Sequence, residues 1–482
     1  MLTFPDVSLT ALLPIIISLV TACIATLGGL YTSRQNVAYI GLGGLVLTLI
    51  SLIALWNNNN TTSFKGALLA DNYAVAFSSV IVIGALLSLV ASLDSARKAQ
   101  LNFPEFDALL HFGITGCLII AFAGDLVVLL IGVEVMSLAS YVLATFQTSR
   151  RAEEAGMKYF LLGSIGSAIL IYGIALTFGA TGHFDFVGIA TAIAQKDFAN
   201  NTLLVMGSLL MLAGFSFKVG MAPFHQWTPD VYAGSPTLVT LFMSIVVKTA
   251  AFAGFVRVFQ VALGSSDAWQ VPLQILIGLT VIVGNMAAIR QNELKRMLAY
   301  SAIAHSGYLA LAMLSSPQSG SNALVFYLLS YTLMNAGAFA VIGAIQKDDR
   351  GATLEDLRGL FYRRPMYAVA MGLFLASLAG LPPLGGFIGK YTLFSAAFSN
   401  GYVFISVLCI VSSMYALVYY LRPAMMMFMR AEGGEMPLQL EPRPSSGVTI
   451  ALSAVGVLLL GIVPGVVLGL LEGAGKLLQA ML

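Results

Sequence analysis

The chain has 482 residues, of which 58% are hydrophobic and only 10% are charged, and its formal net charge at pH 7 is +2. This composition excludes an ordinary soluble domain, and the nearly neutral charge gives no support for nucleic-acid binding. Cys23, Cys117 and Cys409 lie far apart in apolar segments without metal-ligand spacing, which predicts inert thiols and neither a metal site nor a cluster in this chain. We therefore expect an all-α polytopic membrane protein.

About 20 apolar residues are enough to cross a bilayer as a helix, and fourteen such segments are predicted. They cover residues 8–31, 38–56, 73–93, 108–123, 126–147, 158–179, 202–224, 237–260, 271–290, 297–315, 323–346, 365–398, 403–428 and 447–471. No basic region precedes the first segment, so it is interpreted as a spanning helix and not as a signal peptide. Basic pairs such as Arg150 and Arg151 gather in alternate loops, and the positive-inside rule then places both termini on the outer face.

The seventh and twelfth predicted spans contain helix-breaking residues at membrane depth. Gly220 and Pro223 follow Lys218 in the seventh span, and Pro382 precedes Lys390 in the twelfth. Backbone groups in a bilayer must be satisfied internally, so such breaks are tolerated only where protein or water lines them. We predict that both helices are broken, and that each neighbouring lysine has a function.

The two predicted breaks also resemble each other in sequence, GMAPF from Gly220 and GLPPL from Gly380. Two units of five spans would each place the broken helix fourth. Because five is odd, the second unit would be inverted relative to the first, as in many transporters. The predicted organisation is a three-helix segment at 1–107, the units 108–260 and 271–428, and a C-terminal helix within 429–482.

Four charged residues at membrane depth are the main candidates for proton transfer: Glu134, Lys218, Lys248 and Lys390. A charge at the centre of a spanning helix costs about 2.5 to 3.5 kcal/mol or more, so an unused charge is disfavoured. Glu134 is the one acidic residue that the pattern places clearly inside a span. Lys248 is too central to reach the membrane surface easily. For Lys390, a purely structural role in anchoring the carbonyls of the broken helix stays open.

Four further residues have weaker claims. Lys158 lies near the start of its span, where reaching toward the basic surface is as good an explanation as function. His225 follows the first break and His305 lies within a span, and each could either exchange protons or hold a neighbouring helix. Asp230 precedes a turn, so we expect it to be the N-cap of the next helix.

A buried lysine and a glutamate can form a switch for protons. At about 6 Å and an effective dielectric near 20, their attraction is about 3 kcal/mol. Opening or closing such a pair changes the stability of the protonated lysine by that amount, which is enough to release or retain a proton.

The segments PFHQWTPDVYAGSPT, NELKRMLAYSAIAHSGY and GLPPLGGFIGKY occur in this order. Together they resemble the antiporter-like membrane subunits of respiratory complex I, and PDVY followed by GSP is most similar to the subunit N group of bacterial NADH–quinone oxidoreductases. The resemblance extends over essentially the whole chain. It implies fourteen spans, two inverted five-helix units and a path that couples quinone reduction to proton pumping.

The resemblance also implies roles for individual residues. Glu134 and Lys218 would form the switchable pair, Lys248 would be the connecting lysine, and Lys390 would face the exit side. Lys158 matches a lysine that is frequent in the subunit N group.

Partners and cofactors follow from the same resemblance. This chain would carry no redox cofactor, whereas NADH, FMN, iron–sulfur clusters and quinone would bind to partner subunits. The expected partners are peripheral subunits, a neighbouring antiporter-like subunit and small membrane subunits, all in or at the bacterial cytoplasmic (inner) membrane.

Two alternatives share these features in part. The chain could be a subunit of a multi-subunit sodium–proton antiporter or of a membrane-bound hydrogenase. It could also be a structural spacer of the membrane whose charges are relics.

Overall fold

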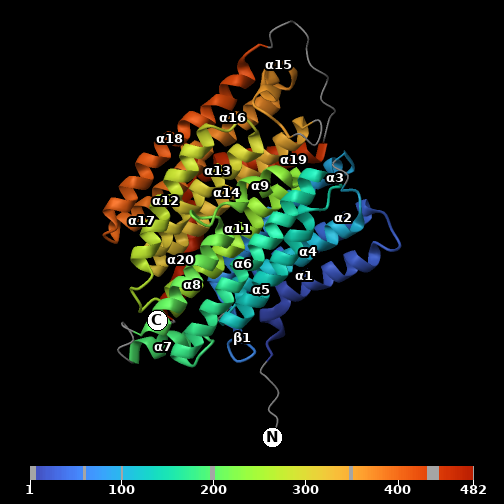
Figure 1. The fold of residues 1–482 in the computed structure, drawn as a ribbon. Helices are drawn as coiled ribbons and strands as arrows, with labels where there is room; N and C mark the ends of the chain where they lie inside the picture. Colours follow the sequence, from blue (N-terminus) through green and yellow to red (C-terminus); the bar gives the residue numbers. More distant parts are fainter. Residues whose placement is uncertain are drawn as a thin grey trace.

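The computed structural model describes residues 7–57, 61–98, 101–195, 201–346, 351–430 and 444–480. The long helices form a single bundle, with α7 and β1 at one end and α15 at the other (Figure 1). In the described part of the chain, thirteen helical stretches are long and apolar enough to cross a membrane. The prediction of an all-helical membrane protein is therefore confirmed.

The N-terminal part consists of three helices and two short strands. The elements are α1 (Leu9–Gly28), α2 (Arg34–Leu55), β1 (Thr61–Ser63), β2 (Leu68–Ala70) and α3 (Asn72–Lys98). The strands are antiparallel, with Thr61 opposite Ala70. The side chain of Ser8 accepts a hydrogen bond from the Ala11 amide and so caps the start of α1.

The next elements contain the first predicted break. They are α4 (Pro104–Phe122), α5 (Leu126–Ala144), α6 (Arg150–Thr181), α7 (Phe186–Gln195), α8 (Thr202–Val219), α9 (Trp227–Gly234), α10 (Thr237–Phe242), η1 (Met243–Val247), α11 (Lys248–Val256) and η2 (Arg257–Ala262). From α10 to η2 the helix is continuous and completely buried. Its η1 and η2 segments are π-helical, a local widening that is frequent at functional sites.

The C-terminal elements contain the second predicted break. They are α12 (Gln270–Ile289), α13 (Leu294–Ala310), η3 (Leu311–Leu314), α14 (Pro317–Ile345), η4 (Glu355–Leu357), α15 (Leu360–Arg363), α16 (Pro365–Ala379), α17 (Gly385–Ser399), α18 (Val403–Phe428), α19 (Pro444–Ile462) and α20 (Pro464–Ala480). Helix α14 packs against α16, α17, α19 and α20, which places it at the centre of this part of the bundle.

Both breaks occur at the predicted glycines. Helix α8 ends at Gly220, with φ +74°, and α16 ends at Gly380, with φ +89°. This left-handed conformation suits glycine, and it lets the cap amide bond back to the carbonyls of the last turn. Both predicted interruptions are confirmed, because the chain resumes as α9 in one case and as α17 in the other.

Some predicted boundaries are wrong. The stretch predicted as a turn around Asp230 is the separate helix α9. The fourteenth predicted span, 447–471, is divided between α19 and α20 at Pro464. Proline has no amide hydrogen and its ring clashes with the preceding turn, which ends the regular hydrogen-bond pattern there.

A buried acidic residue that was not among the candidates lies at the start of α4. Asp107 lies in the first turn of α4, is completely buried, and forms an ion pair with Arg34 of α2 at 3.0 Å. A second buried pair joins Arg257 of η2 to Asp71. The Arg257 guanidinium donates to both Asp71 carboxylate oxygens, at 2.9 and 2.7 Å, and lies over the Tyr73 ring. These pairs connect the N-terminal segment to α4 and η2.

Breaking the pair between Asp71 and Arg257 should destabilise the protein strongly. Asp71→Asn leaves a buried guanidinium without its counter-charge, so we expect a loss of about 3 to 5 kcal/mol in the free energy of unfolding. Unfolding of the purified protein in detergent, followed by circular dichroism, measures this loss. Replacing both partners, Asp71→Leu with Arg257→Met, should recover much of it. Glu355→Gln, which breaks an exposed pair with Arg358, should change little.

Candidate functional site

The three lysines predicted at membrane depth are all buried inside the bundle. Their exposed fractions are 9% for Lys218, 4% for Lys248 and 4% for Lys390. They lie in the last turn of α8, at the start of α11 and in α17. Each ammonium group is held by hydroxyl or carbonyl oxygens, and within the described ranges none of these lysines forms an ion pair.

Lys218 is held by two serines from neighbouring helices. Its Nζ donates to Ser137 Oγ of α5 at 2.9 Å and to Ser167 Oγ of α6 at 3.1 Å. The lysine also lies at the C-terminal end of α8, where the helix dipole favours a positive charge. The ammonium group is thus stabilised beside the break without a carboxylate in contact.

Glu134 lies on α5, one turn before Ser137. No ion pair within 4.0 Å joins it to Lys218 in the described structure, although its charge reaches Lys218 electrostatically. One of its carboxylate oxygens, Oε1, is buried and has no hydrogen-bond partner among the described residues. In the structure the predicted pair is therefore separated, and the Lys218 ammonium group is hydrogen-bonded to Ser137 instead of Glu134.

Lys248 is connected to the end of α8 through one hydroxyl group. Its Nζ donates to the Ala302 carbonyl at 2.6 Å and to Ser306 Oγ at 3.0 Å, and Ser306 Oγ donates to the Val219 carbonyl at 2.5 Å. Val219 is the residue after Lys218. A cavity of about 10 Å³, large enough for about one water molecule, is lined by both Lys218 and Lys248.

His305 lies between Lys248 and Lys390 within a group of tyrosines. Its Nδ1 is 2.6 Å from the Tyr327 hydroxyl, and its Nε2 is 3.2 Å from the Tyr420 hydroxyl. The charges of both lysines act on His305. The sequence left the role of His305 open, and the structure places its ring in the row of buried polar groups.

Two further tyrosines connect this histidine to the lysines. The His305 ring is 5.2 Å from the Tyr331 ring and 5.5 Å from the Tyr308 ring. Lys248 Nζ lies 5.4 Å from the Tyr331 ring centre, and Lys390 Nζ lies 5.3 Å from the Tyr308 ring centre. Aromatic faces attract cations, so these contacts help to keep both ammonium groups in the interior.

Lys390 binds the end of the broken helix. Its Nζ donates to the carbonyls of Leu378 and Ala379, at 2.9 and 3.0 Å, and to Ser413 Oγ at 2.9 Å. These two carbonyls belong to the last turn of α16, where intrahelical partners are missing. The anchoring role that was an open alternative for Lys390 is therefore present in the structure.

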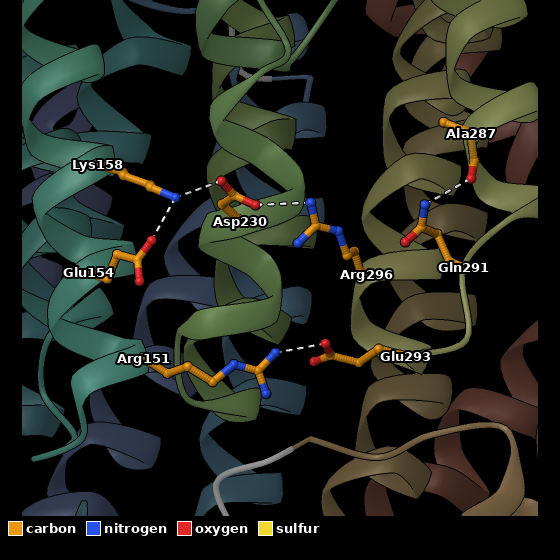
Figure 2. A network of polar contacts seen from close by, with 8 residues as sticks. All are labelled: Arg151, Glu154, Lys158, Asp230, Ala287, Gln291, Glu293 and Arg296. Carbon is orange, nitrogen blue, oxygen red and sulfur yellow. Dashed lines mark hydrogen bonds and ion pairs between the residues drawn. The ribbon is translucent and has the colours of Figure 1, made fainter.

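Lys158 lies outside the buried row. Its side chain is 41% exposed and forms ion pairs with Glu154 and Asp230, both at 2.8 Å. Figure 2 shows Asp230 of α9 between Lys158 of α6 and Arg296 of α13, which it contacts at 3.0 Å. The predicted N-cap role of Asp230 is wrong. Asp230 is inside α9, because Pro229 fits the first turn of a helix, and α10 starts after Pro236 without a side-chain cap.

His225 lies in the loop between α8 and α9 and is half-buried. Its Nδ1 has no hydrogen-bond partner among the described residues, whereas its backbone carbonyl accepts from the Thr228 amide at 2.9 Å. The structure does not bring its side chain into the lysine row.

Sequence reasoning missed the neutral partners of the lysines, such as Ser137, Ser306 and Tyr327. Single serines and tyrosines in apolar helices are common, so their presence carries little information. The one available signal was spacing, since residues three apart share a helix face and Ser137 follows Glu134 by three. Within the described ranges, no group of three or more His, Cys, Asp or Glu residues is placed to hold a metal ion.

The anchoring by Lys390 can be tested separately from proton transfer. Lys390→Met removes the donor for two buried carbonyls, and each unsatisfied group costs about 1 to 3 kcal/mol. We expect faster hydrogen exchange of the backbone amides around Gly380 in the variant. Lys390→Arg keeps the charge and donors and should restore part of the protection. Unchanged exchange in Lys390→Met would contradict the anchoring.

The chain is similar to known proteins over most of its length. Residues 123–415 match the family described as NADH:quinone oxidoreductase/Mrp antiporter, TM. The chain is 51% identical to NADH-quinone oxidoreductase subunit N of Deinococcus radiodurans, over 96% of each chain. It is 38% identical to subunit N of Trichlorobacter lovleyi, over 98% of each chain.

Solved structures show the same fold. A chain of respiratory complex I from Thermus thermophilus superimposes with a TM-score of 0.83 and 36% identity, covering 96% of this chain and all of that one. A chain of an archaeal membrane-bound sulfane sulfur reductase gives a TM-score of 0.86 at 23% identity, covering 97% of each chain. The latter likeness concerns the fold alone. The chain belongs to the subunit N family of NADH-quinone oxidoreductase, the antiporter-like membrane subunits of complex I.

Proposed function

We propose that this proton-translocating subunit moves protons along the buried row formed by Glu134, Lys218, Lys248, His305 and Lys390. The observation that carries the proposal is the burial of three ammonium groups without a carboxylate in contact, connected by hydroxyls and a small cavity. Their positive charges are expensive at membrane depth, so each lysine can give up a proton when its surroundings change.

The separated arrangement of Glu134 and Lys218 is one of two states of a switch. With Lys218 on Ser137 and Ser167, the lysine receives little help from the carboxylate. Movement of the ammonium group to Glu134 would add an attraction of about 3 kcal/mol at about 6 Å. Closing the pair retains a proton on Lys218, and opening it favours release toward Lys248 through the shared cavity.

The proposed topology is fourteen crossings of a bacterial cytoplasmic membrane with both termini on the outer face. It consists of the segment 1–107, two inverted units at 108–260 and 271–428, and a C-terminal part at 429–482. The similar ends of α8 and α16 support two related units, because each stops at a left-handed glycine beside a buried lysine. In this arrangement α16 and α17 together form the broken twelfth crossing.

The remaining parts of the machine are assigned to other subunits. NADH, FMN, iron–sulfur clusters and quinone would bind there, and quinone reduction would drive the switch from outside this chain. A neighbouring antiporter-like subunit and small membrane subunits would contact it laterally.

Removing Lys218 or Lys248 should lower proton pumping in the assembled enzyme. For Lys218→Ala and Lys248→Ala we expect fewer protons pumped per NADH oxidised, by up to the share that this subunit contributes, because each substitution removes one proton carrier from the row. The measurement is proton uptake by membrane vesicles per NADH oxidised. Lys65→Gln, at an exposed loop lysine, is the matched control and should pump normally. Normal pumping in Lys218→Ala would exclude the proposed role.

The alternative is a subunit of a multi-subunit sodium–proton antiporter or a membrane-bound hydrogenase. A chain of the Mrp complex from Dietzia sp. has a TM-score of 0.84 at 21% identity, which supports a shared fold and no more. Purification of the tagged chain distinguishes the two. We expect NADH-oxidising and iron–sulfur subunits to co-purify, and their absence would favour the alternative.

A purely structural spacer is tested by Glu134→Gln. The substitution keeps the size of the side chain and removes its charge. If both pumping and quinone reduction stay normal, the spacer explanation gains support over the switch.

A further inference from the structure

Helix α9 forms one wall of the cavity between Lys218 and Lys248. Trp227, Thr228 and Tyr232 of this eight-residue helix line the cavity together with the two lysines. The indole Nε1 of Trp227 donates to the Phe217 carbonyl at 2.9 Å and thereby fixes the start of α9 to α8. The position of α9 therefore decides the size and shape of the space that joins the two lysines.

Asp230 is on the same short helix but is not one of the residues that line this cavity. It follows the lining residue Trp227 by three positions and lies between Thr228 and Tyr232 in sequence. Figure 2 shows its carboxylate between two cations, with Oδ2 2.8 Å from Lys158 Nζ and Oδ1 3.0 Å from Arg296 Nη2. One carboxylate of α9 thus connects α6 to α13.

Two further contacts lie around α9: one joins the same two helices, and the other joins α13 to the end of α9. Arg151 of α6 contacts Glu293, directly before α13, at 2.6 Å, as Figure 2 also shows. Lys295 of α13 donates to the carbonyl of Ser235, the C-cap of α9, at 2.7 Å. Helix α9 is therefore held on both sides, by α6 from one proposed unit and by α13 from the other.

We infer that Asp230 is a positioning residue for proton transfer, which sets the Lys218–Lys248 cavity by holding α9 between Lys158 and Arg296. The inference rests on the proposed function of the two lysines. An isolated helix of eight residues is not stable in water, so contacts with its neighbours must fix α9. The cavity of about 10 Å³ is at the lower limit for one water molecule, so a small shift of α9 decides whether water fits.

Because Asp230 holds α9 to both proposed units, it also responds to movement between them. A relative movement of α6 and α13 lengthens one of its two ion pairs unless α9 moves as well. The carboxylate therefore transmits displacement between the units to the cavity wall. This role explains why Lys158 lies outside the buried row of lysines: it holds Asp230.

The test uses the complete complex with five variants of this chain. Asp230→Asn removes the charge at constant size, and Asp230→Glu keeps it. Lys158→Gln and Arg296→Gln remove one cation each, and the double variant removes both. The matched control is Glu355→Gln, which breaks an exposed ion pair away from α9. Hydrogen exchange of peptides covering 226–235 and protons pumped per NADH oxidised are measured for each.

We expect Asp230→Asn to speed exchange in α9 by about two- to tenfold, as for the loss of two exposed ion pairs, and to lower pumping. Each single cation variant should have a smaller effect, because the other cation still holds the carboxylate. The double variant should match Asp230→Asn. Asp230→Glu should restore both hydrogen exchange and pumping in part. If Asp230 served folding alone, recovery of exchange would not have to be accompanied by recovery of pumping.

If Asp230→Asn leaves hydrogen exchange in α9 unchanged, the inference is overturned, whatever the result of the pumping measurement. Faster exchange with normal pumping also overturns it, provided that Lys218→Ala pumps poorly in the same assay. If Lys218→Ala pumps normally, the proposed function fails, and faster exchange in Asp230→Asn still supports the positioning of α9. The two failures are therefore distinguishable.

Discussion

The need to satisfy three buried ammonium groups without carboxylates in contact governs the interior of this protein. For Lys390 the break in the helix supplies the acceptors, since a helix that stops inside the bundle leaves carbonyls free, whereas serine hydroxyls hold Lys218. Lys390 binds two such carbonyls at the end of α16, and Lys218 lies in the last turn of α8. Lys248 takes a carbonyl and a serine of α13 at the junction with a π-helical segment. Each buried lysine therefore lies next to irregular backbone, and at Lys390 that backbone supplies the acceptors.

The broken helix α8 and the short helix α9 can transmit movement of their neighbours to the buried lysines. The end of α8 and the short helix α9 border the same cavity, and the groups that hold α9 come from α6 and α13. Charged contacts near the surface, centred on Asp230, are thus joined to uncharged contacts in the interior, centred on Ser306 and the lysines. A displacement of α6 relative to α13 can therefore reach the cavity between α8 and α9 through a few residues.

The sequence predicted the parts that depend on strong local signals. Glycine and proline marked both breaks, and charges in apolar segments marked the three lysines. It failed where a tertiary contact decides the structure. Asp230 has the sequence context of a cap, yet two distant cations and Pro229 place it in a helix. Buried Asp107 was missed because its partner, Arg34, is distant in sequence and no local pattern reveals the pair.

The most direct test of the central claim is a structure of the assembled complex at a resolution that shows ordered water. We expect a water molecule in the cavity between Lys218 and Lys248, and further waters that connect Lys248 through His305 to Lys390. A dry, closely packed interior between these groups, with a continuous chain of waters elsewhere in the subunit, would contradict it.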